Sequence, residues 1–264
     1  MDLQLSGKRA LVTGSTVGIG FAIALELARE GVAVTVNGRS PERVADAVRR
    51  LRGLVPGAVV SGVAADLASV AGVAELIEAC PATDLLVNNL GIFDPVPFED
   101  IPDSEWQHFF ETNVMSGVRL SRHYLPLMKA ANWGRIVFIS SESGVNPPAE
   151  MVHYGMTKAA QLSVSRGLAQ TCAGTGVTVN AVLPGPTRSE GVAGFFGKLA
   201  RAQGISLDEA ERCFFVEARP TSILKRFIDP SEVAALVTYV CSPRAAATNG
   251  AALRVEGGII SSMC

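Results

Sequence analysis

A tyrosine and a lysine stand four residues apart near the start of residues 151–170, where apolar residues recur at helical spacing. In a helix, this spacing places the phenol of Tyr154 and the ammonium of Lys158 on one face, one turn apart. A free phenol has a pKa of about 10, and a neighbouring positive charge lowers it. The pair therefore has the chemistry of a general acid and base. Taken alone, it is also the pattern of a core tyrosine beside a solvated lysine.

A second chemically suggestive stretch is TGSTVGIG, residues 13–20, which follows an apolar strand and leads into a helix. Gly14 permits a tight turn, and Gly18 and Gly20 let the backbone approach a bound group closely. The free N–H groups and positive end of the helix suit a pyrophosphate. The spacing is neither G-x-G-x-x-G nor a P-loop, so the turn could also serve helix–strand packing alone.

The elements that must position these residues alternate along the chain. Apolar strands are expected at residues 9–14, 32–38, 59–67, 84–91, 134–141, 177–185 and 251–258. Helices are expected at residues 19–31, 40–53, 104–130 (bent or re-capped around Pro126), 151–170 and 231–242. This alternation predicts an α/β, Rossmann-like three-layer fold with a doubly wound parallel sheet of about seven strands. We expect residues 1–264 to form one domain, with ligands at the carboxyl ends of the strands.

Composition excludes several classes of protein. The 264 residues are 48% hydrophobic and 18% charged, with a net charge of −2 and no basic block, so we expect no nucleic-acid partner. Five scattered cysteines without CxxC spacing, and three histidines without metal spacing, predict no metal and free thiols in a reducing cytoplasm. The start of the chain lacks the apolar core of a signal peptide. No apolar run approaches the roughly 18 residues of a membrane helix.

Six motifs in order give a more specific indication. They are Thr13-Gly14-x-x-x-Gly18-x-Gly20, Asn88-Asn89-Leu90-Gly91, Asn113, Ser141, Tyr154-x-x-x-Lys158 and Pro184-Gly185. Together they resemble the short-chain dehydrogenases/reductases, in the single-domain branch, and the resemblance runs from Gly7 to Gly258. It implies NAD(P)-dependent interconversion of alcohols and carbonyls.

The resemblance also implies a catalytic set. Tyr154 would act as general acid and base, with its pKa lowered by Lys158, which would also hold the nicotinamide ribose. Ser141 would hydrogen-bond the substrate oxygen, with its neighbour Ser140 as the rival for that role. Asn113 would hold a water that links Lys158 to solvent.

A cofactor-binding set follows from the same resemblance. Its members are Gly14, Ser15, Gly18, Ile19, Gly20, Asp66, Leu67, Asn89, Gly91, Tyr154, Lys158, Pro184, Gly185 and Thr187. Asp66 would lie on the adenine side, with Leu67 offering its backbone. Leu90 replaces the family's usual alanine and adds bulk where adenosine should pack.

Cofactor choice depends on the end of the second strand, which reads VTVNGRSPER at residues 34–43. NAD-dependent enzymes usually carry an acidic residue there, and this stretch has none directly after the strand. Arg39 suits a 2′-phosphate by charge and fork geometry. We therefore expect NADP(H) to be preferred and NAD(H) to be possible, although Arg39 could also be a solvated turn residue.

We expect a small-molecule carbonyl or alcohol as substrate, and the apolar residues of the segment below favour an apolar or medium-sized carbonyl. Residues 188–226 are expected to form a lid carrying Val192, Phe195, Phe196, Phe214 and Phe215. These aromatics could instead be buried in the core or at a subunit interface. Ile92, Phe93, Val145 and His153 could line the same pocket, though His153 could equally be structural.

The helices starting near Ser104 and Met151 resemble those that pair in the family's oligomers, so we expect a homotetramer, or otherwise a dimer. Two alternatives to this enzyme remain open. One is a nucleotide-binding family member that acts as a sensor or scaffold without turnover. The other is an epimerase or dehydratase acting on nucleotide sugars, for which 264 residues leave little room.

Overall fold

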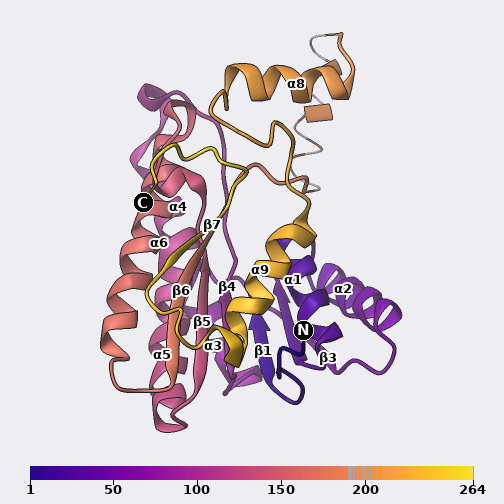
Figure 1. Ribbon diagram of the computed structural model, residues 1–264, viewed down its shortest axis with the longest axis vertical. Helices are drawn as coiled ribbons and strands as arrows, with labels where there is room; N and C mark the ends of the chain where they lie inside the picture. Colours follow the sequence, from indigo (N-terminus) through magenta and orange to yellow (C-terminus); the bar gives the residue numbers. More distant parts are fainter. Residues whose placement is uncertain (190–191, 193, 195, 198–199, 202–203, 264) are drawn as a thin grey trace.

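Seven parallel strands form one sheet in the order β3-β2-β1-β4-β5-β6-β7 (Figure 1). The computed structural model describes residues 1–189, 192, 194, 196–197, 200–201 and 204–263. The strands are β1 (Arg9–Val12), β2 (Ala33–Gly38), β3 (Val60–Ala64), β4 (Leu85–Asn88), β5 (Gly134–Ile139), β6 (Val177–Pro184) and β7 (Ala252–Val255). The strand order reverses between β1 and β4, and that switch point is where parallel sheets of this type bind ligands. The predicted fold class is confirmed.

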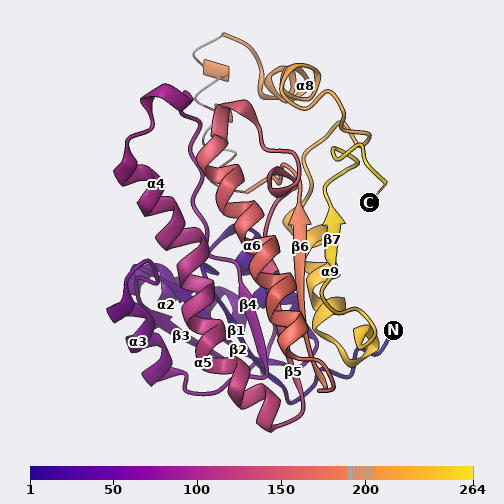
Figure 2. The ribbon, with the colours of Figure 1, turned by 90° about the vertical axis from the view of Figure 1, so that its left-hand side faces the viewer.

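Helices cover both faces of the sheet (Figure 2). The helix α1 (Gly18–Arg29) packs against α2 (Pro41–Leu54) and α9 (Pro230–Cys241) on one face. The other face carries α3 (Val70–Ala79), α4 (Asp103–Phe110), α5 (Ser116–Ala130) and α6 (Val152–Thr171). These helices lie on both sides because each parallel crossover must pass over one face of the sheet.

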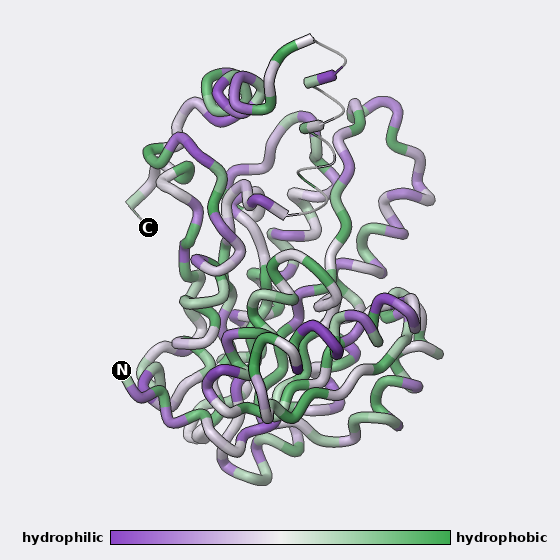
Figure 3. Tube along the Cα trace, turned by 90° about the vertical axis from the view of Figure 1, so that its right-hand side faces the viewer, coloured by the Kyte–Doolittle hydropathy of each residue, from purple (hydrophilic) through white to green (hydrophobic). Residues whose placement is uncertain are grey.

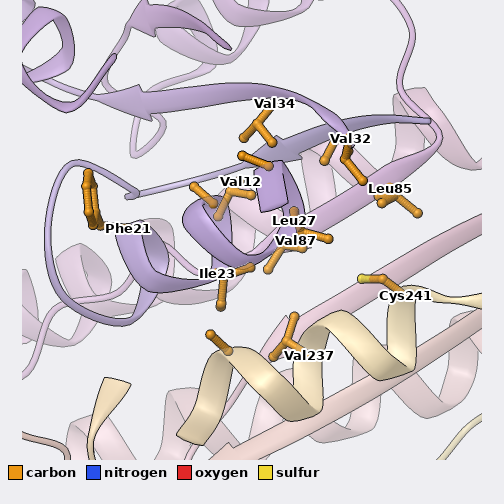
Figure 4. Close-up of a cluster of buried hydrophobic side chains, with 14 of the residues drawn as sticks. Val12, Phe21, Ile23, Leu27, Val32, Val34, Leu85, Val87, Val237 and Cys241 are labelled. Carbon is orange, nitrogen blue, oxygen red and sulfur yellow. The ribbon is translucent and has the colours of Figure 1, made fainter. Parts of the chain in front are cut away.

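The central strands β4, β5 and β6 read as mostly apolar runs because both of their faces are buried, whereas the edge strands β3 and β7 are partly exposed. In β1, Val12 belongs to the core cluster that includes Ile23 of α1 and Val237 of α9, as Figure 4 shows. Its neighbour Leu11 points to the opposite cluster, which includes Leu120 of α5. The sheet therefore lies between two hydrophobic clusters, one on each face, which hold the strand ends that carry the site in place.

Two features of the helices differ from the sequence expectation. The short helix α3, capped by Ser69 through a 3.0 Å bond from the Gly72 amide, was not expected between β3 and β4. The expected helix 104–130 is interrupted by a π-helical turn at Glu111–Met115, not at Pro126, which lies inside α5. Single π turns of this kind occur frequently at functional sites, and this one contains Asn113.

The segment expected to form a lid contains α8 (Leu207–Glu217), which lies beyond the carboxyl ends of the strands (Figure 1). Phe196, Phe214, Phe215 and Phe227 pack on one another there, with ring centroids 5.0–5.5 Å apart. Figure 3 shows α8 alternating hydrophilic and hydrophobic residues, as a helix with one buried face does. Phe195 lies outside the described residues. The described aromatics therefore form a small core of their own.

None of the helices in the described part of the chain combines the length and apolar character needed to span a membrane.

Candidate active site

The glycine-rich turn between β1 and α1 is shaped by close backbone approach. Gly14 and Gly18 have φ angles of +58° and +59°, in the region that favours glycine. A Cβ on Gly20 would lie 2.5 Å from Asn89 Nδ2. That amide donates to the carbonyl oxygens of Thr13 (2.9 Å) and Gly14 (3.0 Å), so the Asn89 side chain holds the turn itself.

The start of α1 suits an anion. Its N-cap residue, Val17, offers no side-chain hydrogen bond, which leaves the N–H groups of the first turn free to bind a phosphate. Ile19 is half-buried and packs against the core. Ser15 is fully buried and its hydroxyl donates to the Val12 carbonyl (2.7 Å), so only its backbone faces the turn.

The end of β2 presents Arg39 to solvent. The side chain is exposed and makes no hydrogen bond or ion pair with the residues that the structure describes. Ser40 caps α2 by accepting from the Arg43 amide at 3.3 Å and donates to Glu42 at 2.6 Å, so Glu42 pairs with Ser40. A Cβ on Gly38 would lie 2.6 Å from the methyl group of Thr16. The absence of a side chain at Gly38 therefore lets the end of β2 lie close to the glycine-rich turn.

The remaining expected cofactor residues lie at neighbouring strand ends. After β3, Asp66 is exposed and Leu67 is fully buried, so the backbone contact expected of Leu67 stays a prediction. After β6, a Cβ on Gly185 would lie 2.7 Å from the Glu256 carbonyl, and the Thr187 hydroxyl donates to the Gly185 carbonyl at 2.8 Å. The segment then passes the glycine turn, where a Cβ on Gly18 would lie 3.4 Å from the Ser189 side chain.

The ammonium group of Lys158 is buried and held in place. Its Nζ donates to the Ile139 carbonyl at the end of β5 (2.9 Å) and to Gln161 Oε1 (3.2 Å). A Cβ on Gly91 would lie only 3.3 Å from Nζ, so glycine leaves room for Lys158 at the end of β4. Burial lowers the pKa of Lys158 to about 7, and the negative charge of Glu142 partly opposes this shift.

Tyr154 is half-buried in the first turn of α6, with Lys158 Nζ 5.5 Å from the centre of its ring. Burial raises the pKa of Tyr154 above its usual value, and the charge of Glu142 raises it further. The Ser141 hydroxyl and the charge of Arg219 act in the opposite direction. The lowered pKa expected from Lys158 is not found. Burial is the largest influence on the pKa of Tyr154, and burial also lowers the pKa of Lys158, which reduces its positive charge at neutral pH.

The two serines after β5 have different surroundings. The Ser140 hydroxyl donates to the Lys158 carbonyl at 2.8 Å and thereby ties β5 to α6. The Ser141 hydroxyl lies toward Tyr154 and donates to the carboxylate of Glu142. A Cβ on Gly144 would lie 2.9 Å from the Lys158 backbone, so glycine lets this loop lie against α6. Ser141 is therefore the serine placed beside the phenol.

Asn113 is buried in the π-helical turn and holds the chain after β4. Its Oδ1 accepts from the Ile92 amide at 2.8 Å, and its Nδ2 donates to the Ile92 carbonyl at 3.0 Å. The Asn113 carbonyl accepts from Gln161 Nε2 at 2.6 Å, and Gln161 in turn accepts from Lys158. Gln161 thus joins Asn113 to Lys158. The water that Asn113 was expected to hold, as a link from Lys158 to solvent, stays a prediction.

Sequence reasoning missed Gln161, Glu142 and Arg219. Gln161 follows Lys158 by three residues on the same helix, which was an available signal. Nothing local indicated that Arg219, distant in sequence, would pair with Glu142.

Among the expected pocket residues, Phe93 and Val145 are 48% and 45% exposed, and Phe93 meets the Tyr154 ring edge-on with centroids 6.3 Å apart.

The imidazole of His153 packs against two aromatic residues of α4, Trp106 and Phe109. It is buried against Phe109, with ring centroids 4.0 Å apart, and burial lowers its pKa. Of the two roles considered for His153, the structure therefore favours packing between α6 and α4.

Residues 8–198 match the family model described as short chain dehydrogenase. The chain is 51% identical over 263 residues to YvaG, an oxidoreductase of Bacillus subtilis, with full coverage of both chains. It is 33% identical to a D-beta-hydroxybutyrate dehydrogenase of Cupriavidus necator, covering 98% of this chain and all of that one. The structure is similar to L-sorbose reductase of Gluconobacter frateurii, solved with NADPH and L-sorbose, with a TM-score of 0.94, 32% identity and full coverage of both.

The chain belongs to the short-chain dehydrogenase/reductase family. It is therefore an NAD(P)-dependent oxidoreductase that acts on CH–OH groups or the corresponding carbonyls.

Proposed function

We propose that this protein catalyses the NADPH-dependent reduction of a ketone or aldehyde, or the reverse oxidation of the alcohol. The observation that carries the proposal is the convergence of Tyr154, Ser141 and Lys158 at the end of β5. Lys158 is fixed there by the Ile139 carbonyl, and Ser141 lies two residues further along the chain. The glycine turn and the free start of α1 supply a matching cradle for a dinucleotide.

A nicotinamide bound here would supply or accept the hydride. Tyr154 gives a proton to the substrate oxygen during reduction, and Ser141 holds that oxygen against the phenol. Because burial raises the pKa of Tyr154, the phenol stays protonated at neutral pH, which is the state that a general acid needs. Lys158, with a pKa of about 7, can change its own protonation in the same pH range.

The preference for NADPH rests on the end of β2. Arg39 is exposed and without a partner among the described residues. None of the residues 37–40, which read NGRS, is acidic. A carboxylate there would repel a 2′-phosphate, and Arg39 attracts it. The NADPH complex of L-sorbose reductase supports the same preference.

The test is an assay of NADPH oxidation with a panel of carbonyl compounds that includes neutral ketoses, keto acids and aldehydes. Turnover of at least one compound, lost in Tyr154→Phe, is the expected result. NADPH binding without turnover of any compound would favour the sensor or scaffold alternative. Assembly as a homotetramer and residence in the cytoplasm stay predictions, and sedimentation at micromolar protein concentration tests the first.

A further inference from the structure

A buried carboxylate lies directly beside Ser141. Glu142 is 4% exposed, and its Oε2 accepts hydrogen bonds from the Ser141 hydroxyl, the Ser143 amide (2.6 Å) and the Ser143 hydroxyl (2.8 Å). Buried carboxylates require partners of opposite charge to offset the loss of hydration. Glu142 has such a partner, and it comes from a distant part of the chain.

That partner is Arg219, two residues after the end of α8. Its Nε lies 3.2 Å from Glu142 Oε1, and the two side chains are only 9% and 6% exposed. Its Nη1 donates to Glu150 at 3.0 Å and to the Ala218 carbonyl at 2.7 Å. The guanidinium also lies 5.5 Å from the ring centre of Phe214 in α8. One buried ion pair thus connects the α8 segment to the residue next to Ser141.

The position of the single Ser141 proton follows from counting donors. The Ser143 amide donates to Ser141 Oγ at 3.1 Å, so that oxygen acts as an acceptor there. An ionised carboxylate can only accept, so the bond between Ser141 and Glu142 uses the Ser141 proton. A substrate oxygen held by Ser141 needs this same proton. The strength with which Glu142 holds it therefore affects the reaction.

We propose that Glu142 and Arg219 are positioning residues that act through Ser141, with Arg219 weakening the hold of Glu142 on the Ser141 proton so that the hydroxyl can turn to the substrate oxygen. This inference rests on the proposed function, in which Ser141 holds that oxygen. A carboxylate is a stronger acceptor than a neutral carbonyl, and the guanidinium on Oε1 reduces that advantage. Ser143 still gives Oε2 two hydrogen bonds when Ser141 turns away.

The charges of this pair also reach the phenol. The pKa of Tyr154 is raised by Glu142 and lowered by Arg219, so the pair acts in opposite senses on one group. Among the residues that the structure describes, Lys158 also faces the ring, with Nζ 5.5 Å from its centre. Arg219 belongs to the segment that contains α8. Through the Arg219–Glu142 ion pair, the position of that segment therefore affects how easily the Ser141 hydroxyl can turn to the substrate oxygen.

The first experiment compares Arg219→Gln with Arg219→Gln/Glu142→Gln, using a carbonyl substrate that the parent enzyme reduces. Without Arg219, the Glu142 carboxylate holds the Ser141 proton uncompensated, so kcat should fall about tenfold, a coupling within the range for contacting residues. NADPH affinity should not change. The double variant removes the carboxylate charge as well, and its kcat should return to within about twofold of the parent.

A matched control is Arg9→Gln, which removes an exposed ion pair with Asp84 at the start of β1, outside the expected lid. Its kcat should stay within about twofold of the parent. Thermal unfolding of every variant shows which of them are folded. The double variant carries no unpaired charge at Glu142, so it remains informative even if Arg219→Gln is unstable. A double variant as slow as Arg219→Gln would overturn the proposal, because it would show that the ion pair only holds the fold together.

The second experiment repeats Arg219→Gln in a Ser141→Ala background. If Arg219 acts through Ser141, its removal should now change kcat by no more than about twofold. An undiminished tenfold loss would mean that Arg219 acts by another route. Absence of turnover in the parent enzyme refutes the proposed function and this inference together. Turnover that is insensitive to Arg219 refutes this inference alone.

Discussion

Ser15 in the glycine turn and Asn37 at the end of β2 are joined by two hydrogen bonds. The Ser15 amide donates to the Asn37 carbonyl at 2.9 Å, and the Asn37 amide donates to the Ser15 hydroxyl at 3.0 Å. The Asn37 side chain is fully engaged as well. It accepts from the Gly14 amide at 3.3 Å and donates to two carbonyls, of Val63 and Ala65, at 3.2 Å. Asn37 is therefore a structural residue that joins three strand ends.

This arrangement determines which side chains at the end of β2 can meet a 2′-phosphate. Asn37 is occupied and Ser40 caps α2, so Arg39 is the remaining side chain with free donors. Arg39→Ala should weaken NADPH binding roughly three- to tenfold, because an exposed charged contact is partly screened, and should leave NADH binding unchanged. Affinities measured by titration at fixed ionic strength give the comparison.

Arg49→Ala is the matched control for that experiment. It removes the same charge from α2, where Arg49 pairs with Asp46. We expect no change in the ratio of the two affinities. Equal losses for NADPH and NADH in Arg39→Ala, or a parent protein that prefers NADH, would contradict the assignment of Arg39.

Tyr154→Phe tests the acid–base role with little change in packing. The ring and its edge-on contact with Phe93 remain, and only the hydroxyl is lost. We expect kcat to fall roughly hundredfold or more, which is the range of general acid–base catalysis. NADPH affinity should stay near that of the parent. A phenylalanine variant with turnover close to that of the parent would show that another group supplies the proton.

Burial of Lys158 predicts how stability depends on pH. Its pKa is about 7 in the folded protein and 10.5 as the ordinary value, so between these pH values the unfolded chain binds the additional proton. The free energy of unfolding should therefore rise with pH from about 7, because a buried charge is no longer required. Below pH 7 both states carry the proton, and the unfavourable contribution of burying the charge is constant.

Lys158→Met should remove this contribution. The comparison is made between pH 7 and 8.5, before Cys241, whose pKa burial raises to about 12, adds the opposite trend. Cofactor-free protein is unfolded thermally or by urea at several pH values, and the difference between parent and variant is taken. A difference that does not depend on pH would show that Lys158 keeps its charge in the folded state.

The sequence was sufficient to predict the sheet, and the roles of the site residues stay predictions. The central strands β4, β5 and β6 are mostly apolar and buried on both faces. Most glycine and polar site residues lie at a strand end or in the first turns of a helix, whereas Asn113 lies in the π-helical turn. The helix α3 was missed because its residues Val70–Ala79 include Gly72, which breaks the usual helical pattern. There a Cβ would lie 2.1 Å from the Asp66 carbonyl, so glycine is a requirement of packing that sequence patterns do not show.

The electrostatics of the site could not be read from the sequence. The Tyr154–Lys158 spacing suggested a lowered pKa for the phenol, but burial raises it. Burial depends on which distant segments cover the site, and the pairing of Glu142 with Arg219 is a contact of that kind. The direction of the pKa shift is therefore a property of the tertiary structure.

Adding one methyl group to the glycine turn, by the change Gly20→Ala, tests whether the turn holds the cofactor. A Cβ on Gly20 would lie 2.6 Å from the Gly14 carbonyl and 2.5 Å from Asn89 Nδ2, and the carbonyl belongs to backbone that cannot easily move aside. Gly20→Ala must therefore displace the turn that would hold the pyrophosphate. We expect the free energy of unfolding to fall by about 1–3 kcal/mol, as for other overpacked sites.

Gly53→Ala is the control, because a Cβ there meets no atom within 4 Å and Gly53 lies in the last turn of α2. Alanine in a helix is favoured over glycine by about 0.5–1 kcal/mol, so this variant should be slightly more stable than the parent. A ligand that binds only the folded state raises the melting temperature, and NADPH provides that measurement. The NADPH-induced rise should persist in Gly53→Ala and be largely lost in Gly20→Ala. If Gly20→Ala keeps the full rise, the pyrophosphate does not rest on this turn.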